Sequence, residues 1–203
     1  MGWPRTAREH VTDAENARTW MLQVKGGDAR AFRLLYERFK GPIMSYIHSM
    51  VSDPALTEDL TQEVFLKVYR VRETYEPSAQ FSTWLWTIAR NACIDQLRKA
   101  SNREELVTKK DDEDSPSFDL ESIEAPLPGA EAQLIERADQ ARVQRCIEGL
   151  SPQQREALLL RTQSELPYEE IARITGSSLS SVKSLIFRAK ESLMKCLGGS
   201  NER

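Results

Sequence analysis

The sequence predicts an all-α fold of two small helical domains joined by a flexible acidic linker, the C-terminal one a helix-turn-helix. Apolar residues recur at helical spacing along most of the 203 residues, and no stretch alternates as a half-buried strand would. From residue 103 to about 128 the chain is acidic, interrupted by prolines and poor in large apolar residues. That composition is typical of a linker or a weakly ordered segment.

Four helices are expected in the first half, over residues 31–39, 43–50, 60–71 and 81–99. Gly41-Pro42 should end the first of them, because proline lacks the N–H that a helix interior needs. Asp53-Pro54 indicates a turn, and Ser82 or Thr83 is available as N-cap of the fourth helix. The helical pattern resumes near Ala130 and runs to Leu197.

These patterns divide the chain into five parts. They are an N-terminal extension over 1–22, a first domain over 23–102, the acidic linker over 103–130, a second domain over 131–198 and a C-terminal tail over 199–203.

Composition and charge exclude several classes of protein. The net charge of −3 argues against a protein that coats nucleic acid indiscriminately, but it is compatible with local basic faces. No run of about 18 apolar residues exists, so no membrane insertion is expected, and the polar N-terminus does not resemble a secretory signal. The sequence offers no nucleophile–base pair, metal cluster or glycine-rich phosphate loop. We therefore expect no catalytic residue, no metal, no cofactor and no enzyme activity.

The cysteines point to a reducing compartment. Cys93, Cys146 and Cys196 are odd in number and far apart, and no CxxC motif is present. Neither a disulfide framework nor a zinc site is therefore expected, and a reducing cytoplasm fits best.

The second domain carries a helix-turn-helix pattern between residues 166 and 197. A short helix over Tyr168–Thr175 meets Gly176, which suits a left-handed turn, and a second helix begins near Ser180. The apolar residues of this second helix recur at helical spacing and should pack inward: Val182, Leu185, Ile186, Ala189 and Leu193. Its outer face then carries Lys183, Ser184, Phe187, Arg188 and Glu191.

That outer face has the chemistry of DNA recognition. Lysine and arginine side chains reach guanine or phosphate, a serine hydroxyl reaches either a base or a phosphate, and Phe187 could contact a thymine methyl group. Free N–H groups at Ser180 and Ser181 suit a phosphate. Two plainer interpretations stay open: a hairpin with a solvated basic face, and a Phe187 that packs against a neighbour. The acidic residues nearby are expected to be solvated or to supply helix-start charge: Glu156, Glu169 and Glu170.

Residues 81–99 read FSTWLWTIARNACIDQLRK and place two tryptophans at positions that cannot share a helix face. Helical phase puts Trp86 on the apolar arc and Trp84 among polar side chains that include Asn91 and Arg98. An exposed ring beside an amide and an arginine could stack an unpaired base, read its edge and hold its phosphate. Such a base must first leave the duplex stack. The alternative is that Trp84 packs under the loop over 75–80.

The helix before it, EDLTQEVFLKVYRV over residues 58–71, has two distinct faces. Its core stripe is formed by Leu60, Val64, Phe65 and Val68. Its polar face carries Asp59, Gln62, Glu63 and Lys67. Such a face is either simply solvated or a docking surface for a partner.

Taken together, these motifs resemble one family, the extracytoplasmic-function (ECF) subfamily of bacterial RNA polymerase sigma factors. The resemblance runs from Gly27 to about Leu197 and rests on motifs in a fixed order: GDARAFRLLYERF, DLTQEVFLKVYR, FSTWLWTIARNACIDQLRK, and LSPQQREALLLR with LPYEEIARITG and VKSLIFRAKESL. It implies a dissociable, non-enzymatic specificity subunit in the cytoplasm that directs promoter recognition, melting and stress-responsive initiation. The alternative is a free-standing helix-turn-helix regulator, which would bind its promoter tightly without polymerase.

The resemblance also implies partners and site residues. The partners are core RNA polymerase, through the clamp of its largest subunit and also its second-largest subunit, promoter DNA and an anti-sigma factor. The positions that match core-binding residues are Asp59, Gln62, Glu63 and Phe65. Those that match −10 DNA contacts are Tyr75, Trp84, Arg90, Asn91 and Arg98, with Asn91 lining the pocket for a flipped base. Those that match −35 DNA contacts are Ser180, Ser181, Lys183, Ser184, Phe187, Arg188 and Lys190. The acidic linker resembles the segment that threads toward the polymerase active-site and RNA-exit channels.

Two departures from the family pattern bear on promoter choice. Thr87 and Ile88 stand where housekeeping sigma factors carry a tryptophan pair that wedges the duplex open, so melting should depend more on a good sequence match. Leu185 stands where many members carry a basic residue, so one phosphate contact near the −35 element is expected to be missing.

Overall fold

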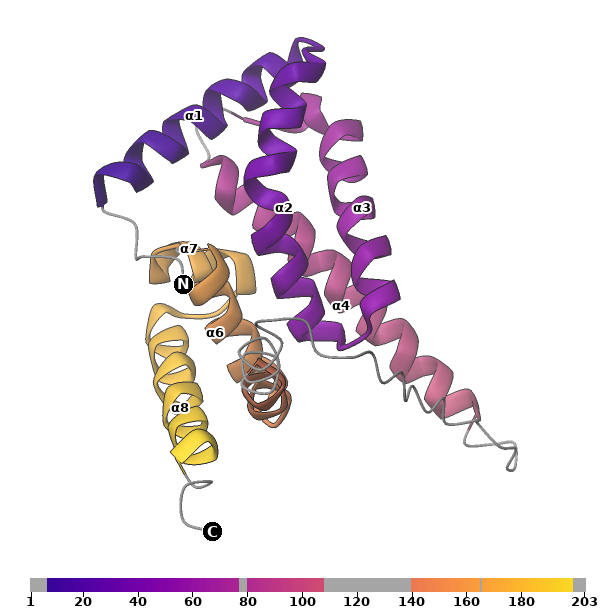
Figure 1. Ribbon diagram of the computed structural model, residues 1–203, viewed down its shortest axis with the longest axis vertical. Coiled ribbons are helices and arrows are strands. Elements are labelled where there is room, and N and C mark those ends of the chain that lie inside the picture. Colours follow the sequence, from indigo (N-terminus) through magenta and orange to yellow (C-terminus); the bar gives the residue numbers. More distant parts are fainter. Residues whose placement is uncertain (1–6, 77–79, 108–139, 165, 199–203) are drawn as a thin grey trace, which may run out of the picture.

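A computed structural model describes residues 7–76, 80–107, 140–164 and 166–198. Every regular element in these ranges is a helix, which confirms the all-α prediction (Figure 1). The elements are α1 (Ala7–Lys25), α2 (Ala29–Val51), α3 (Pro54–Arg70), the short 3-10 helix η1 (Arg72–Thr74), α4 (Phe81–Val107), a helix over 140–148, α6 (Pro152–Ser164), α7 (Tyr168–Thr175) and α8 (Leu179–Gly198).

Helix α1 occupies much of the predicted N-terminal extension. It buries Ala17, Met21 and Val24 against the core, and these residues recur at the spacing of one helix face. The Lys25 ammonium group donates a hydrogen bond to the Tyr75 carbonyl oxygen at 3.2 Å, which ties the end of α1 to the segment before α4. The described part of this segment therefore belongs to the first half of the fold.

Helix α2 runs straight through Gly41-Pro42, so the prediction of two separate helices is wrong. Pro42 lies inside α2 and deprives it of one backbone hydrogen bond. Leu35 on one side of the proline and Ile43 and Ile47 on the other are all fully buried in the same core. Their joint burial, about 1.5–3 kcal/mol for each side chain, outweighs the cost of a proline in a helix interior, about 3 kcal/mol.

Helices α3 and α4 also start differently from the prediction. Asp53 is the N-cap of α3, its carboxylate accepting from the Leu56 N–H at 3.0 Å, and Pro54 opens the helix. Asp53-Pro54 is thus a helix start where a turn was predicted. Ser82 and Thr83 lie inside α4, where an N-cap was expected, and the helix continues to Val107 within the predicted linker.

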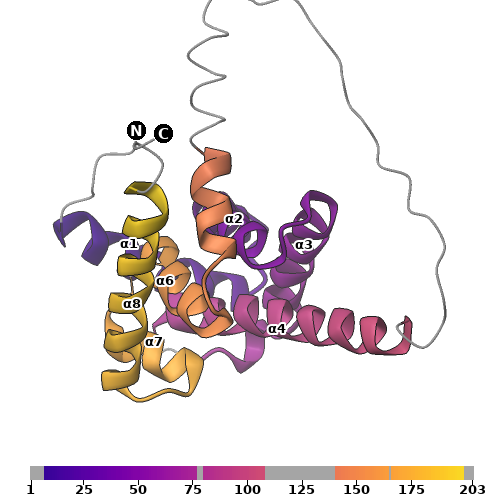
Figure 2. The ribbon, with the colours of Figure 1, turned by 90° about the horizontal axis from the view of Figure 1, so that it is seen from below.

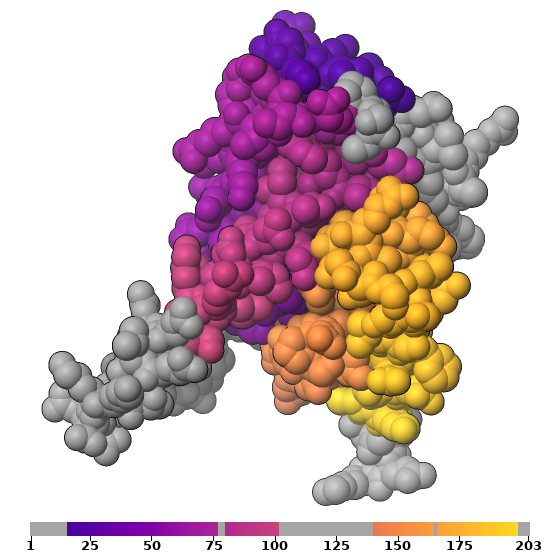
Figure 3. Space-filling model, turned by 180° about the vertical axis from the view of Figure 1, so that it is seen from behind, coloured from indigo at the N-terminus to yellow at the C-terminus, as the bar shows by residue number. Residues whose placement is uncertain are grey.

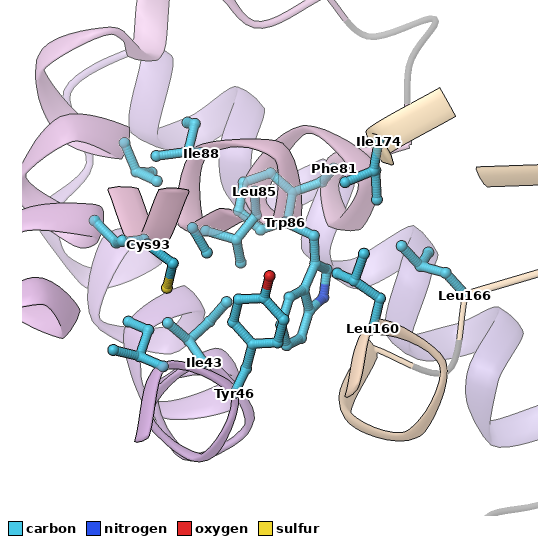
Figure 4. Close-up of a cluster of buried hydrophobic side chains, with 14 of the residues drawn as sticks. Ile43, Tyr46, Phe81, Leu85, Trp86, Ile88, Cys93, Leu160, Leu166 and Ile174 are labelled. Carbon is cyan, nitrogen blue, oxygen red and sulfur yellow. The ribbon is translucent and has the colours of Figure 1, made fainter. Parts of the chain in front are cut away.

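The two halves of the described chain pack against each other and share one hydrophobic core. Helix α6 lies against α2 and α7 lies against α4, and Figure 3 shows the second half directly against α4. At the centre, the Trp86 indole packs on the Tyr46 ring with centroids 5.4 Å apart, and Leu160 of the second half lies beside it, with Leu166 beyond Leu160 in the same cluster (Figure 4). We call this contact between the halves the seam.

Cys146 and Cys196 form a disulfide, with their Cα atoms 5.9 Å apart, so the expectation of unpaired cysteines is wrong. The two cysteines are 50 residues apart in sequence. They meet because α6, α7 and α8 fold back on the helix over 140–148. Cys93 is the free cysteine, and burial together with the nearby Glu156 carboxylate raises the pKa of its thiol to about 12. None of the helices described here combines the length and apolar character needed to cross a bilayer.

Candidate nucleic-acid interface

Helices α7 and α8 form the helix-turn-helix that the sequence predicts. Helix α7 spans Tyr168–Thr175, and Gly176 follows it in the left-handed region with φ of 68°. Ser178 then caps α8, its hydroxyl oxygen accepting from the Ser181 N–H at 3.2 Å. The prediction of a free N–H at Ser181 is therefore wrong, since that donor is already bonded.

The two faces of α8 are sorted as predicted. Val182, Ile186 and Ala189 are buried, and Leu185 and Leu193 are half-buried. All seven residues expected at the −35 element are exposed: Ser180, Ser181, Lys183, Ser184, Phe187, Arg188 and Lys190. The Phe187 side chain is 64% exposed, which excludes the alternative that it packs against a neighbour in this structure. The outer face thus combines three cations, three hydroxyl groups and one aromatic ring.

In α4 the two tryptophans are both packed. Trp86 is buried in the seam, as predicted. The Trp84 ring lies 5.5 Å from the Tyr75 ring and 6.0 Å from the Phe81 ring, so the alternative of packing against the preceding segment is confirmed. Trp84 is partly buried, so some of its surface is still exposed. Tyr75 is 0% exposed, and burial raises the pKa of its hydroxyl; its expected place on a DNA-binding surface is wrong for this conformation.

The remaining polar residues of α4 point in two directions. Asn91 and Arg98 are exposed, and Arg98 lies 3.4 Å from the Asp95 carboxylate on the same helix. Arg90 instead turns into the seam, where its Nε donates to Glu156 Oε1 of α6 at 2.6 Å. The expected DNA-binding group Arg90 is thus engaged by the second half in this structure.

A second polar contact crosses the seam beside it. The Thr83 hydroxyl donates to Glu170 Oε2 of α7 at 2.8 Å, and Arg173 lies 2.9 Å from the other oxygen of that carboxylate. Glu156 and Glu170 are both buried, so neither is solvated, whereas Glu169 is exposed. Glu169 and Glu170 lie in the first turn of α7, which matches the expected helix-start charge. One signal was available: Glu156 directly precedes ALLL, a run too apolar to face water.

A groove of about 310 Å³ lies in the seam between these elements. Its lining includes Arg90, Ile94 and Leu97 of α4, and Ser181 and Leu185 of α8. The groove therefore brings residues of the proposed −10 helix and of the proposed −35 helix together.

The α3 surface matches the prediction in its polar part. Asp59, Gln62 and Glu63 are exposed. Phe65 is only 3% exposed and its ring lies 4.9 Å from the Tyr36 ring, so its expected role as a direct contact to polymerase is wrong for this conformation. Sequence reasoning missed Leu66 and Tyr69, which are exposed on the same helix. The sequence did contain an indication of this surface, because Leu66 and Tyr69 are large apolar residues that lie off the core stripe and one helical turn apart.

The helix over 140–148 lies between α2 and α8 (Figure 2). The Ser52 hydroxyl donates to Glu148 Oε1 at 2.7 Å and the Ser49 hydroxyl donates to Gln144 Oε1 at 3.3 Å, both across from α2. Gln144 Nε2 in turn donates to Glu148 Oε1 at 3.0 Å, and the two hydrogen bonds that Glu148 accepts, from Ser52 and Gln144, lower the pKa of its carboxyl. The opposite side of the same helix carries Cys146, bonded to α8.

Comparison with known proteins gives matches over both halves. Residues 35–103 match the family Sigma-70 region 2, and residues 140–193 match Sigma-70, region 4. The chain is 34% identical to RNA polymerase sigma-H factor of Pseudomonas aeruginosa over 86% of this chain and 90% of that protein. It is 31% identical to ECF RNA polymerase sigma-E factor of Escherichia coli, over 84% of this chain and 88% of the relative. It is also 31% identical to ECF RNA polymerase sigma factor BldN of Streptomyces coelicolor, over 94% of this chain and 70% of BldN.

Two solved structures share the fold. One is CnrH in complex with the cytosolic domain of CnrY, with a TM-score of 0.67 and 20% identity over 92% of this chain and 99% of that chain. The other is the sigma factor RpoE in complex with the anti-sigma factor NepR from Bartonella quintana, with a TM-score of 0.66 and 23% identity over 86% of this chain and all of that chain.

Proposed function

The chain belongs to the ECF sigma factors of bacterial RNA polymerase, and on that premise we propose which of its surfaces carry out promoter recognition. It is a specificity subunit of transcription initiation and neither a free-standing regulator nor an enzyme. Its partners are core RNA polymerase and promoter DNA, and its place of action is the cytoplasm, where both are found.

The exposed polar face of α3 is the proposed docking surface for core polymerase. Asp59, Gln62 and Glu63 supply carboxylate and amide groups, and Leu66 and Tyr69 supply apolar area on the same helix. Polar groups that surround a few exposed apolar anchors suit a protein interface. The partner is the clamp of the largest subunit, with further contacts to the second-largest subunit. Phe65 is buried under this surface, where it packs against Tyr36 and supports α3 without contacting the partner.

The exposed part of α4 is the proposed −10 surface. Asn91 is the candidate for hydrogen bonding to a base that has left the stack, and Arg98 for holding its phosphate. The partly buried Trp84 adds an aromatic ring beside them. Arg90 can join this surface only when it leaves Glu156, so its contribution requires the seam to open.

The outer face of α8 is the proposed −35 surface, and it is the observation that carries the proposal. Lys183, Arg188 and Lys190 lie exposed behind a glycine turn, with three serines and Phe187. A helix that presents basic and hydroxyl side chains in this way fits the major groove. The half-buried Leu185 supplies no charge there, which supports the expected lack of one phosphate contact.

An anti-sigma factor is the proposed regulatory partner. The two solved structures described above each contain a bound protein, the cytosolic domain of CnrY in one and the anti-sigma factor NepR in the other. The predicted acidic linker over 103–130 lies outside the described residues except for its first five, which continue α4.

Run-off transcription with purified core polymerase tests the function. Core enzyme with this protein should give promoter-dependent product from a genomic template pool, and core enzyme alone should give none. A sigma factor should also elute with core polymerase on a sizing column. Absence of both product and complex would overturn the proposal.

Single substitutions test the surfaces separately. Arg188→Ala should cost about 1–3 kcal/mol of binding free energy and relax preference at one −35 base if Arg188 reads a base. A uniform loss of binding over all −35 sequences would make Arg188 a phosphate contact.

Asn91→Ala should lower open-complex formation mainly on templates matched at −10, and an equal effect on all −10 variants would exclude a pocket role.

A further inference from the structure

The disulfide between Cys146 and Cys196 links the helix over 140–148 to α8. Cys146 is buried on the helix over 140–148, and Cys196 is exposed in the last turn of α8. The segment between the two cysteines contains α6, α7 and most of α8, and so includes the helix-turn-helix formed by α7 and α8. The Arg142 guanidinium donates to the Leu197 carbonyl oxygen at the same junction.

The helix that carries Cys146 also faces the first half of the fold. Gln144 accepts a hydrogen bond from Ser49 of α2, and Glu148 accepts one from Ser52, the C-cap residue of α2. Figure 2 shows this helix between α2 and α8. The disulfide therefore fastens α8 to a helix that is itself held by α2.

We propose that Cys146 and Cys196 form a reversible thiol–disulfide site, which exchanges with low-molecular-weight thiols and disulfides and fastens the helix over 140–148 to α8. Three observations favour exchange at this site. Cys196 is open to solvent, its partner lies directly beneath it, and the third cysteine is buried elsewhere in α4. Accessible cysteines exchange and buried apolar ones are inert.

The exchange can be written step by step. In the oxidising direction, the Cys196 thiolate attacks a small disulfide such as oxidised glutathione and releases one glutathione thiol. The Cys146 thiol then loses its proton and attacks the Cys196 sulfur of the mixed disulfide, which releases the second glutathione thiol. Two protein thiols are oxidised and one small disulfide is reduced to two thiols. In the reducing direction, glutathione attacks the exposed Cys196 sulfur first.

Reduction has a structural consequence. Without the covalent link, the helix over 140–148 is held by its polar contacts to Ser49, Ser52 and Leu197, by the hydrogen bond from Arg155 of α6 to the Glu148 carbonyl oxygen, and by the burial of Cys146 and Ile147. We expect this helix to detach more readily from α8, and the oxidised chain to hold α8 closer to α2. If α8 reads the −35 element, which rests on the proposed function, reduction should also free it to take up its place on DNA.

The first experiment equilibrates the full chain in buffers with a range of reduced to oxidised glutathione, followed by acid quenching, alkylation and mass spectrometry. As the ratio of reduced to oxidised glutathione rises, Cys146 and Cys196 should become alkylated together. Cys93 should stay unlabelled in the native chain. The reduced chain should melt about 8 °C or more below the oxidised chain. A pair that stays oxidised at every ratio, or that is never oxidised, would overturn the proposal.

Variants separate the link from general destabilisation. Cys196→Ser should abolish the dependence of melting on the glutathione ratio, and Cys93→Ala should retain it. Amide hydrogen exchange should then show faster exchange over 140–148 in reduced wild type and in Cys196→Ser than in oxidised wild type. Equal exchange in all three would show that the disulfide fastens nothing.

A run-off assay tests the regulatory consequence. Product from core polymerase with the reduced protein should exceed that with the oxidised protein at least about fivefold, the lower end of usual couplings between sites. Cys196→Ser should give equal product at every ratio. Equal product from oxidised and reduced wild type would overturn this consequence. Failure of all forms to support transcription would instead count against the proposed function, because thiol counting and melting need neither polymerase nor DNA.

Discussion

Trp84 and Trp86 illustrate how two nearly opposite faces of one helix can both be packed, Trp86 fully and Trp84 in part. Positions two apart differ by about 200° around a helix, so a single neighbour cannot cover both. Trp86 is covered by Tyr46 from α2 and by Leu160 from the second half. Trp84 is covered by Tyr75 instead. The polar character of its helical neighbours gave no sign of this second layer.

Two aromatic truncations should separate stability from recognition. Trp86→Ala removes a fully packed indole and should lower the free energy of unfolding by about 3–5 kcal/mol. Phe187→Ala removes a ring that is 64% exposed and should change that free energy by about 0.5 kcal/mol or less. Urea denaturation followed by circular dichroism measures both. An equal loss in the two variants would contradict the assignment of Phe187 to the outer face.

Cys93 should be unreactive in the folded chain. Burial raises the pKa of its thiol from 9.0 to about 12, which reduces the thiolate fraction at pH 8 about 10³-fold. Iodoacetamide should therefore label Cys93 readily in urea and hardly at all in native buffer. Because the folded pKa is raised, this group contributes stability that is present below pH 9 and is lost as the pH rises toward 12. Rapid native labelling at pH 8 would show that α4 opens locally.

At the level of elements, the start of α8 rests on two residues. Gly176 has a positive backbone φ, which residues with a Cβ rarely adopt, and Ser178 caps the helix. Ser178→Ala should lower the free energy of unfolding by about 1 kcal/mol, because the Ser181 N–H loses its acceptor. Ser192→Ala removes an exposed hydroxyl from the same helix without touching a cap, and should leave that free energy unchanged or slightly higher. Equal losses would exclude the cap as the cause.

Helix α7 and the faces of α8 could be predicted because local patterns decide them. Gly176 ends one helix by backbone conformation, and the spacing of Val182, Ile186 and Ala189 defines the buried face. Pro42 could not be assigned in the same way. Whether a proline ends a helix depends on how much apolar area lies beyond it. Ile43 and Ile47 are buried, and their helix α2 packs against α6 of the second half as well as against α3 and α4 of its own half. The same limit explains why neither Ser82 nor Thr83 is the N-cap of α4. The helix begins at Phe81, whose ring is buried in the core, and local sequence does not indicate that burial.

At the level of the whole molecule, the seam is the feature that local patterns could not supply. Arg90 and Glu156 are 66 positions apart, and each alone looks like a solvated charge. The exposed site residues Asn91, Arg98 and those of α8 follow from helix phase, whereas Arg90, Tyr75 and Phe65 depend on what packs over them. Helical phase predicts which side a residue faces, and only tertiary packing decides what covers that side.

The seam should behave as a coupled charge pair in a double-mutant cycle. Arg90 and Glu156 have side-chain exposures of 21% and 10%, so removing one partner leaves the other charge poorly solvated. Arg90→Met and Glu156→Leu should each lower the free energy of unfolding by about 2 kcal/mol, and the double variant by less than either. Urea denaturation of the four proteins gives the coupling energy.

The Asp95–Arg98 pair of α4 is the matched control. Its exposures are 59% and 68%, and water solvates whichever charge remains after substitution. The cycle of Asp95→Leu and Arg98→Met should therefore give a coupling energy of about 0.5 kcal/mol or less. If the Arg90–Glu156 cycle gives no more than this control, the two halves do not hold together through that pair in solution. Arg90 would then be available to DNA without any opening of the seam, and its place on the −10 surface would need no conformational change.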